Sequence, residues 1–512
     1  MTSRYKITVH IFIGLACVCI FLTSCKKFLD EKPSKGSSVV ISTTADLNAM
    51  LNNYADFFKE ADNVVMYGTD DNGFSANLYD AQPFGFSNTI VQFSLWDIDN
   101  LPQTDQSDFT GANFWSGEYT KIFTANLVLA NVATVTGSAE DKAMISADAH
   151  FVRAYSYWQL ANTYCLPYTE ANKNEPGVPI KLIPDYSITG RGTLADTYAQ
   201  IESDLTQALT TTVPLLQNGV ARNWRANKAA VNGFAARFYL NKNDYAKALQ
   251  YANAALGEYS VLVDYNTDMR YGNPSTVNVN GQDETINFPY THDKYINSDP
   301  SYVLGWKEFL YCRILNNNNN WYIPSQDLMN LYDAANDLRY KYHFVQNYSY
   351  SKGFLFPPFK NAGYVFFDNN AMPEGPTVAE MLLTKAECQA RAGDVAGAIT
   401  TVNQLYSKRT VTGTPPLTAA SQDAAIAVVL KERRRELPFS QRWFDIRRFN
   451  SNAYANDDVS LTKQFYPYTA NAVTTGQPLK TYTLPKGSRR FASPLPLSDV
   501  TNSNGLIKQN TY

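Results

Sequence analysis

The amino-acid sequence predicts a mostly α-helical protein whose scaffold is built from pairs of helices. Residues 142–164 carry apolar side chains at intervals of three and four, which places them along one face of a helix. Residues 226–256 and 380–405 resemble each other. In each of them a helix rich in small residues ends at a turn that contains Asp, and a second helix starts directly after it. Repeated helix pairs of this kind indicate a helical-repeat scaffold.

The two similar segments align with one constant offset. The matched positions are Asn243 and Gly393, Asp244 and Asp394, Ala236 and Ala386, and Leu249 and Ile399. Small residues at such positions let helices pack closely, as they do in tetratricopeptide repeats. A free-standing array needs about three repeats, so we expect residues 142–164 and 194–209 to form another unit. The scaffold is thus predicted at about residues 111–256 and 377–450, within a single domain at 41–512.

Aromatic residues concentrate outside the predicted scaffold. There are 14 in the 66 residues from 54 to 119 and 24 in the 109 residues from 259 to 367, against 14 in the 121 residues from 136 to 256. The aromatic-rich segments also contain many Asn and Gly residues and read as loops. Loops held by a rigid scaffold are where binding sites tend to lie. We therefore expect an irregular ligand-binding region at about residues 54–110 and 257–370.

The first 24 residues have the pattern of an export signal. A basic start without acidic residues is followed by an apolar stretch over residues 7–22, which is short for a membrane span. The end of the stretch and the residues after it, up to Cys25 (LTSC, residues 22–25), resemble a bacterial lipobox. In a lipobox the cysteine is diacylated and becomes the new N-terminus. The alternatives are an ordinary signal peptide with an incidental cysteine and an uncleaved anchor. The polar residues 25–40 are predicted to be a tether between the lipid and the body.

Composition excludes some classes of partner. The formal net charge is −3, so no strongly basic field attracts nucleic acid, and we expect no such partner. Hydrophobic residues make up 45% of the chain and charged residues 18%, which is typical of a folded protein. Cys165, Cys312 and Cys388 are widely spaced in apolar surroundings. They are predicted to be buried thiols rather than ligands or parts of a disulfide framework.

The sequence offers little catalytic chemistry. After the export signal the histidines are His150, His292 and His343, and none lies in the spacing of a zinc site. Neither a Gly-x-Ser-x-Gly elbow nor a phosphate-binding glycine loop occurs. We therefore predict no enzymatic activity, no cofactor and no metal. The acidic and Asn-rich loops leave a Ca²⁺ ion open, but no spacing of an EF-hand supports one.

An arginine-rich run covers residues 432–448. Guanidinium groups bind carboxylates and phosphates well, which invites the hypothesis of an anionic ligand. However, Glu432, Glu436 and Asp445 are interleaved with the arginines, and Trp443 is among the apolar anchors. The run is therefore predicted to form a structural network of ion pairs that braces the C-terminal helices.

Several segments, in their order along the chain, resemble the SusD/RagB family of outer-membrane nutrient-uptake lipoproteins of Bacteroidetes. They are CKKFLDEKP from Cys25, FWSGEY at 114–119, ADAHFVRAY at 147–155, EPGVP at 175–179, LMNLYDAANDLR at 328–339, ERRRELPFSQRWFDIRRF at 432–449, PLPL at 494–497 and QN at 509–510. No single segment is decisive, but their order and spacing are specific. The resemblance spans the chain from Cys25 to Tyr512.

The resemblance implies an α-rich fold on tetratricopeptide-like helix pairs, with the ligand site in the irregular region. It further implies a non-catalytic lid on a SusC-like TonB-dependent transporter barrel. The ligand would be an oligosaccharide or, less often, a peptide. The protein is then expected at the outer membrane, anchored by acyl chains such as palmitate on Cys25 and facing the cell exterior.

Six residues of the irregular region are candidates for ligand contact. Binding a sugar needs flat apolar faces for the CH side of the ring and planar polar groups for the hydroxyls. The candidates are Trp96, Trp306 and Trp321 for the faces, and Asp70, Asp71 and Asn72 for the polar contacts. Any given Trp is more often a core residue than a binding surface. The resemblance assigns none of them, because ligand contacts vary between members of the family.

Two other functions stay open on the sequence. A carbohydrate-active hydrolase uses paired carboxylates whose separation is set by the fold, so it leaves no local signature. Two carboxyl groups that face each other across a cleft would favour it, whereas a shallow aromatic surface would not. A helical-repeat scaffold for a protein partner would instead show an extended concave helical surface, with the aromatic segments packed inside.

Replacing Cys25 by Ala is expected to abolish lipid attachment, because this thiol is the acyl acceptor in a lipobox. Labelled palmitate should no longer enter the protein, and the protein should leave the membrane fraction. Cys17→Ala is the matched control, since Cys17 lies within the apolar stretch of the export signal. Palmitate that still enters the Cys25→Ala protein would contradict the lipobox assignment.

Overall fold

The computed structural model describes residues 41–53, 59–60, 64–99, 112–272, 274–290, 301–316, 321–367, 371–469 and 472–512. The export signal, Cys25 and the tether lie outside these residues, so their assignment stays a prediction. Within the described residues, no helix combines the length and the apolar character needed to cross a membrane.

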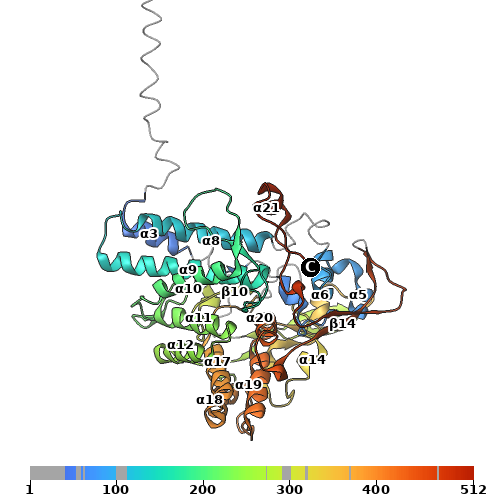
Figure 1. The fold of residues 1–512 in the computed structure, drawn as a ribbon. Helices are drawn as coiled ribbons and strands as arrows, with labels where there is room; N and C mark the ends of the chain where they lie inside the picture. Colours follow the sequence, from blue (N-terminus) through green and yellow to red (C-terminus); the bar gives the residue numbers. More distant parts are fainter. Residues whose placement is uncertain are drawn as a thin grey trace, which may run out of the picture.

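The fold is mostly α-helical, as the sequence predicts, and its longer helices form a stacked scaffold (Figure 1). They are α3 (Thr44–Leu51), α8 (Ala112–Asn131), α9 (Ala139–Tyr164), α10 (Leu194–Ala208), α11 (Lys228–Asn241), α12 (Tyr245–Glu258), α17 (Val378–Arg391), α18 (Val395–Arg409), α19 (Gln422–Glu436) and α20 (Arg442–Phe449). Helix α9 packs against both α8 and α10. The helices predicted at residues 142–164 and 194–209 therefore do form a pair.

The two helix pairs that are similar in sequence, α11–α12 and α17–α18, have the same local structure. Asn243 (φ 59°) and Gly393 (φ 86°) both adopt the left-handed conformation, which ends the first helix of each pair in a tight turn. Asp244 and Asp394 then cap the second helix. Each accepts a hydrogen bond from the backbone amide three residues further on, at 3.1 and 2.9 Å.

Small side chains let these two pairs stack on each other. Helix α12 packs against α17, although more than a hundred residues separate them in the sequence. The buried cluster between the pairs is rich in alanine, and its alanines are Ala229, Ala236, Ala252, Ala255, Ala379 and Ala386. The matched positions Ala236 and Ala386 are both fully buried. The close packing that the repeat pattern predicts is thus present.

The remaining helices are short and lie mainly in the aromatic-rich segments. They are η1 (Val64–Gly68), α5 (Ala76–Ala81), η2 (Pro83–Gly85), α6 (Asn88–Leu95), α13 (Ser301–Leu304), α14 (Gln326–Met329), α15 (Leu338–His343), α16 (Tyr348–Ser351), η5 (Ala455–Asp457), η6 (Arg489–Phe491) and α21 (Leu497–Asn502). The segment after residue 63, which reads as loop in the sequence, therefore contains η1, α5, η2 and α6. Ser75 and Ser87 cap α5 and α6 with their side chains.

The strands are short and form small separate sheets. Strands β1 (Lys59–Glu60), β10 (Ile314–Asn316) and β13 (Ala371–Pro373) make a three-stranded sheet, with β1 parallel and β13 antiparallel to β10. The two-stranded pairs are β2 (Pro176–Pro179) with β3 (Arg191–Thr193), β4 (Leu216–Gln217) with β5 (Val220–Ala221), β6 (Arg270–Tyr271) with β9 (Pro289–Tyr290), β7 (Ser275–Val279) with β8 (Gln282–Ile286), β11 (Phe344–Val345) with β12 (Gly363–Tyr364), β14 (Leu461–Phe465) with β17 (Lys480–Leu484), and β15 (Tyr468–Thr469) with β16 (Ala472–Val473).

The arginine-rich run forms the structural network that the sequence predicts. Three consecutive arginines of α19 bind acids on three different parts of the chain. Their pairs are Arg433 with Asp445 of α20, Arg434 with Asp71 before α5, and Arg435 with Glu432, which also binds Arg339 of α15. An α-helix turns by about 100° per residue, so consecutive side chains point in different directions. The run therefore ties elements on several sides of α19 together.

Helix α20 extends the network to the repeat scaffold. Arg448 binds both oxygens of Glu387 on α17, at 2.6 and 2.8 Å, and Arg391 binds Glu387 at 2.8 Å. Burial opposes ionisation of this carboxyl, but Arg448 and Arg391 outweigh it and lower the pKa of Glu387 to about 2. Glu387 is fully buried. A charged pair in this environment is costly to break, because the remaining charge has no water around it.

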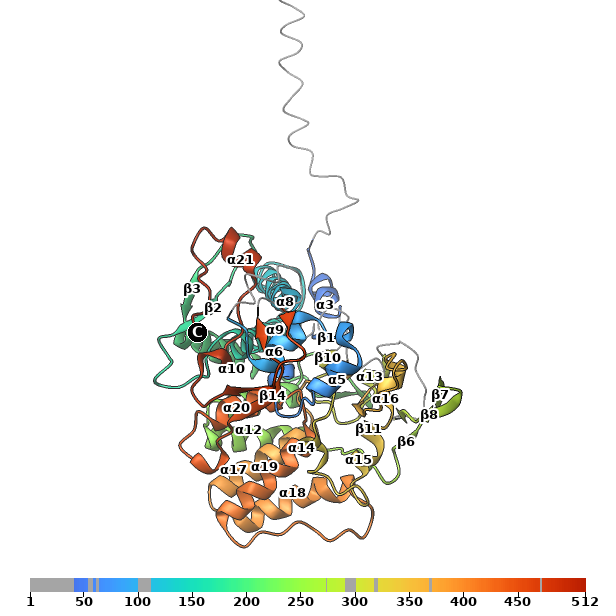
Figure 2. The same ribbon diagram turned by 90° about the vertical axis from the view of Figure 1, so that its right-hand side faces the viewer.

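The C-terminal segment is held against the end of α9. Arg447 donates hydrogen bonds to the carbonyl oxygens of Cys165 and Phe491, and Asn510 donates one to that of Tyr164 at 2.9 Å. The end of a helix carries partial negative charge, which suits a buried cation that has no carboxylate partner among the described residues. Burial lowers the pKa of Arg447 to about 10, so it stays charged at neutral pH. These contacts place α21 beside α8 (Figure 2).

The predicted buried thiols are confirmed. Cys165, Cys312 and Cys388 are all buried and unpaired with one another. Burial raises the pKa of each of these thiols, which keeps them protonated and unreactive.

Glu387→Gln is expected to lower the free energy of unfolding by about 3 kcal/mol at pH 7, because it removes the buried acid that Arg448 and Arg391 share and leaves each of them only its second acid, Asp445 or Asp457. The native pKa of Glu387 lies near 2, below the ordinary 4.5. Its stabilisation is therefore present above pH 4.5 and is lost as the pH falls toward 2. The difference between wild type and variant should shrink over that range, since protonated Glu387 resembles Gln. Urea denaturation at a series of pH values measures it.

Glu170→Gln is the matched control, because the side chain of Glu170 is 82% exposed in its pair with Lys173. It should change the free energy of unfolding by less than about 0.5 kcal/mol. A Glu387→Gln protein as stable as this control would contradict the bracing role of the network.

Candidate functional site

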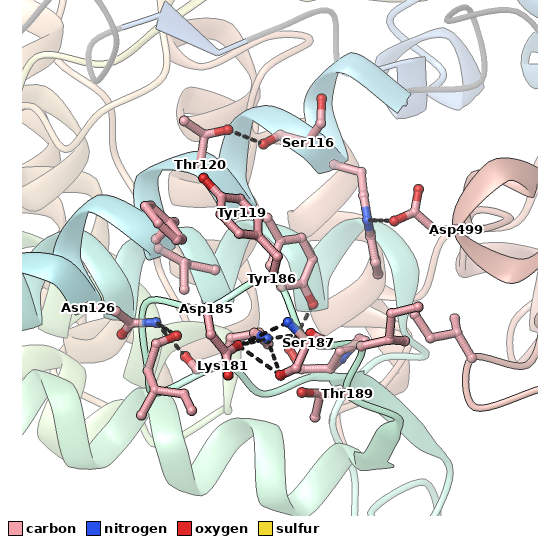
Figure 3. A pocket seen from close by; sticks show the side chains of 17 residues that line it. Ser116, Tyr119, Thr120, Asn126, Lys181, Asp185, Tyr186, Ser187, Thr189 and Asp499 are labelled. Carbon is pink, nitrogen blue, oxygen red and sulfur yellow. Dashed lines mark hydrogen bonds and ion pairs between the residues drawn. The ribbon is translucent and has the colours of Figure 1, made fainter. Parts of the chain in front are cut away.

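A groove of about 460 Å³ lies between three segments that are far apart in the sequence. One wall is the exposed face of α8. The second is the loop of residues 180–190 that joins β2 to β3, here called the groove loop. The third is the C-terminal segment around α21 (Figure 3). The volume falls within the range of about 300–1,000 Å³ that is typical of ligand sites.

Helix α8 supplies the aromatic floor of the groove. Trp115, Tyr119 and Phe123 are spaced by four residues, so they lie along one face of the helix. The rings of Trp115 and Tyr119 have centroids 4.8 Å apart. The Trp115 indole donates a hydrogen bond to Asp499 Oδ1 at 3.2 Å, and the Tyr119 hydroxyl donates one to the Pro179 carbonyl oxygen at 2.8 Å. Through this floor, α8 is connected to the C-terminal segment and to strand β2, which leads into the groove loop.

The most exposed aromatic residue of the site is Tyr186, at the tip of the groove loop. Its ring stacks on that of Phe123, with centroids 5.3 Å apart and an angle of 23° between the planes. Tyr186 is nevertheless 92% exposed. The face that does not meet Phe123 is therefore open to solvent. An open aromatic face above a partly apolar groove is the feature that a sugar ring or another flat amphipathic ligand needs.

Three charged groups line the groove: Lys181, Asp185 and Asp499. Lys181 binds Asp185 Oδ1 at 2.5 Å. Hydrogen bonds from Lys181 and then Ser187 lower the pKa of Asp185, so this carboxyl is ionised at neutral pH. With two carboxylates and one ammonium group, the lining has a small negative charge. This arrangement repels an anionic ligand and accepts hydroxyl donors.

The three tryptophans predicted for ligand contact are core residues. Trp96, Trp306 and Trp321 are only 1–3% exposed. The Trp96 indole donates to the Gly68 carbonyl oxygen at 2.9 Å, Trp306 packs edge-on against Phe366, and Trp321 packs against Phe354. Each buries a large apolar surface, and this burial stabilises the fold. They present no open face in the described structure, so the predicted aromatic surface is not formed by them.

The predicted polar residues also serve the interior. Asp71 is fully buried, where it binds Arg434 at 2.8 Å and accepts from the backbone amide of Phe439 at 2.9 Å. Burial raises the pKa of Asp71. Burial acts the same way on Asp70, but its pairs with Arg442 and Arg434 outweigh it and lower the pKa of Asp70. These residues anchor the arginine-rich run rather than line a groove.

Asn72 completes this anchor. Its side chain donates to the Tyr67 carbonyl oxygen at 2.7 Å and to the Oγ atom of Ser94 at 3.1 Å. Ser94 lies two residues before Trp96. Its backbone also pairs with Pro324, three residues after Trp321. The structure therefore brings the segments of Asp70–Asn72, Trp96 and Trp321 together, but as packed core, and Trp306 lies elsewhere.

The residues of the groove were not among the sequence candidates. One signal was available, namely the apolar residues of the groove loop. Leu182, Ile183, Tyr186 and Ile188 stand in a segment interrupted by Pro and Gly, where no helix or strand buries them. Such a run in a loop indicates exposed apolar surface. The union of this loop with α8 and α21 has no signature in the sequence, because three distant segments form it.

Metal chemistry finds no support among the residues that the structure describes. No three side chains of His, Cys, Asp or Glu come together there in a way that would hold an ion. The Asp70–Asp71 pair is neutralised by Arg434 and Arg442.

Comparison with protein families identifies the class. A model described as "starch-binding associating with outer membrane" matches residues 27–240, and a model of the SusD family matches residues 378–512. Both are SusD models, and their matches contain the scaffold helices from α3 to near the end of α11 and from α17 to α20. The chain belongs to the SusD/RagB family. No curated protein matches the chain.

Solved structures with the same fold include a SusD superfamily protein from Bacteroides thetaiotaomicron, with 18% identity and a TM-score of 0.64 over 92% of this chain and 100% of the other. A SusD-like carbohydrate binding protein from Bacteroides vulgatus has 18% identity and a TM-score of 0.57, covering 91% and 97% of the two chains. A laminarin-binding SusD-like protein has 16% identity and a TM-score of 0.55, covering 92% and 99%. At these identities the likeness establishes the fold.

Proposed function

We propose that this protein is a non-catalytic lipoprotein of the outer membrane that binds a neutral oligosaccharide and delivers it to a TonB-dependent transporter. The groove between α8, the groove loop and α21 is the proposed ligand site. Membership of the SusD/RagB family supports the general role. The observation that carries the site is the open face of Tyr186, stacked on Phe123 at the edge of the groove.

A sugar fits the chemistry of this groove. One pyranose face is lined by CH groups and packs on an aromatic ring, while the hydroxyls need acceptors and donors close by. Tyr186 offers the ring, and Asp185, Asp499 and Ser187 offer oxygen acceptors. The two carboxylates outnumber the one ammonium group, which disfavours a uronic acid or a sulfated sugar. A neutral glycan is therefore the proposed ligand class.

The same groove is poorly suited to glycoside hydrolysis. Such an enzyme needs one carboxyl with a raised pKa as a general acid, beside a second ionised carboxylate. Asp185 has a lowered pKa because Lys181 and Ser187 bind its ionised form. Asp499 accepts a hydrogen bond from the Trp115 indole. Asp185, which Lys181 and Ser187 hold in its ionised form, is therefore unsuited to act as the general acid, and this favours binding over turnover.

Tyr186→Ala is expected to weaken binding of the ligand at least tenfold, about 1.4 kcal/mol, because the ring provides the stacking face. Calorimetry of the soluble body, residues 26–512, against laminarihexaose, maltohexaose, xylohexaose and a polygalacturonate hexamer measures the affinities. Phe356→Ala is the matched control, since Phe356 is 81% exposed in another loop. Binding of the neutral sugars should be unchanged in this control.

Other results in the same panel separate the alternatives. Full affinity in Tyr186→Ala would contradict the groove as ligand site. Preference for the acidic hexamer would contradict the inference that the negative lining of the groove selects neutral sugars. Binding of peptides in place of all sugars would show that the ligand is a peptide. Cleavage of any hexamer, seen by chromatography of the mixture, would overturn the non-catalytic role.

Exposed apolar residues surround the groove and support a docking role for this face. Of the twelve large hydrophobic residues that are exposed in the described structure, five are Leu182, Ile183, Tyr186 and Ile188 of the groove loop and Leu506 of the C-terminal segment. A cluster of this kind marks an interaction site. The helix α3, where the described chain begins, lies at the same end of the molecule as α8 and α21 (Figures 1 and 2). A tether to Cys25 would keep this end near the membrane and its transporter.

Ile183→Asp is expected to reduce association with the transporter at least fivefold, because it places a charge in the apolar docking face. The full-length tagged protein is purified in mild detergent from its native host, and mass spectrometry quantifies a co-purified TonB-dependent barrel. Leu479→Asp is the control, since Leu479 is 49% exposed away from the groove loop. Equal recovery of the barrel with both variants would contradict docking through this face.

A further inference from the structure

The ammonium group of Lys181 closes the groove loop on itself. Its Nζ atom donates hydrogen bonds to Asp185 Oδ1 at 2.5 Å, to Ser187 Oγ at 3.0 Å and to the Ser187 carbonyl oxygen. All three N–H bonds of the ammonium group are thereby used within the loop. Asp185 and Ser187 flank Tyr186, so a single cation holds the residues on both sides of the exposed ring (Figure 3).

The backbone of Lys181 is fixed to the core of the protein. Its N–H donates to the Tyr157 hydroxyl at 2.6 Å, and its carbonyl oxygen accepts from the same hydroxyl at 2.7 Å and from Asn126 Nδ2 at 3.0 Å. Tyr157 of α9 and Asn126 of α8 are both buried. Arg153 orients Asn126 through a bond of 2.7 Å and is itself paired with Asp204. The base of the groove loop, at Lys181, is therefore rigid.

Little else fixes the tip of the loop. Leu182, Ile183 and Ile188 are 46–60% exposed, and Tyr186 touches the body mainly through its stacking on Phe123. Side chains that bury so little surface contribute little to holding a conformation. Ser187 donates to Asp185 Oδ1 from its amide at 3.2 Å and from its hydroxyl at 2.8 Å, and Asn126 Nδ2 lies 3.5 Å from the Ile183 carbonyl oxygen. The bonds of Lys181 add the connection between this turn and the fixed base of the loop, and so restrain the position of Tyr186.

We propose that Lys181 is a positioning residue that holds Tyr186 in its ligand-binding orientation before the ligand arrives. The inference rests on the proposed function of the groove and adds the device that pre-organises it. Ordering a loop during binding costs free energy, and a loop ordered in advance avoids this cost. Lys181 thus raises affinity without touching the ligand, since its three N–H bonds are already occupied.

The test compares Lys181→Met, which keeps the length of the side chain but removes its charge and its hydrogen bonds, with Lys181→Arg, which keeps both. Lys173→Met is the matched control, because Lys173 also binds an acid three residues away, on the surface outside the groove. Hydrogen exchange is followed at two backbone amides of the loop. The amide of Asp185 donates to the Ile183 carbonyl oxygen at 3.0 Å, and the amide of Ser187 donates to Asp185 Oδ1 at 3.2 Å.

In Lys181→Met these two amides should exchange at least tenfold faster than in wild type, and Lys181→Arg and Lys173→Met should stay close to wild type. Calorimetry with laminarihexaose and maltohexaose should show at least a fivefold loss of affinity in Lys181→Met. The loss should appear in the entropy of binding, and Lys181→Arg should restore most of the affinity. Unchanged exchange in Lys181→Met would overturn the proposal that Lys181 holds the tip of the groove loop in place.

Two further outcomes separate this inference from the proposed function. Faster exchange with full affinity would overturn positioning by Lys181 while Tyr186→Ala still identifies the groove as the ligand site. Full affinity in Tyr186→Ala would overturn the groove itself, whatever the exchange rates are. A loss confined to the acidic hexamer would show instead that Lys181 contacts ligand charge directly.

Discussion

The structure depends on the ion pairs that the arginines of α19 and α20 make with acids from the rest of the chain. Arg433 and Arg448 connect α19, α20 and α17, while Arg434 reaches Asp71 near the start of the described chain. Burying such charges is expensive unless every one is matched. Asp71 and Glu387, two of the matching acids, come from distant segments, so the network is complete only when those segments are correctly placed. Its requirement for complete pairing selects one arrangement of the scaffold around α19.

The groove takes its rigidity from this scaffold and its ligand surface from a loop that the scaffold does not cover. Helix α8 is fixed by its packing on α9 and α3. The C-terminal segment is fixed by Arg447 at the end of α9. Between these two walls the groove loop extends from the short sheet β2–β3 into solvent. A binding site with two firm walls and a third wall held by the bonds of Lys181 has a defined shape before its ligand arrives.

The helix pairs and the arginine network were accessible from the sequence, because their causes are local. The Asp-containing turns and the alternating small residues repeat with one offset, and acids interleaved with arginines predict pairing within the run. The ligand site was not accessible in this way. Trp96, Trp306 and Trp321 have the right side chains for a sugar surface, but burial is decided by contacts with distant segments such as Gly68, Phe366 and Phe354. Tyr186 is exposed for the converse reason, since no distant segment covers its loop.

The three consecutive arginines of α19 also bear on how this chain can change over evolutionary time. Inserting one residue before Arg433 would rotate the guanidinium groups of Arg433 and Arg434 by about 100° about the helix axis relative to the preceding turns, and the pairs with Asp445 and Asp71 would be misdirected together. We therefore expect α19 to keep a constant length. None of those pairs involves the groove loop, so it can gain, lose or exchange residues without disturbing them. Homologues with the same scaffold can then diverge in ligand preference by editing a segment of about ten residues, and their sequences should vary in length at the groove loop while α19 keeps a constant register.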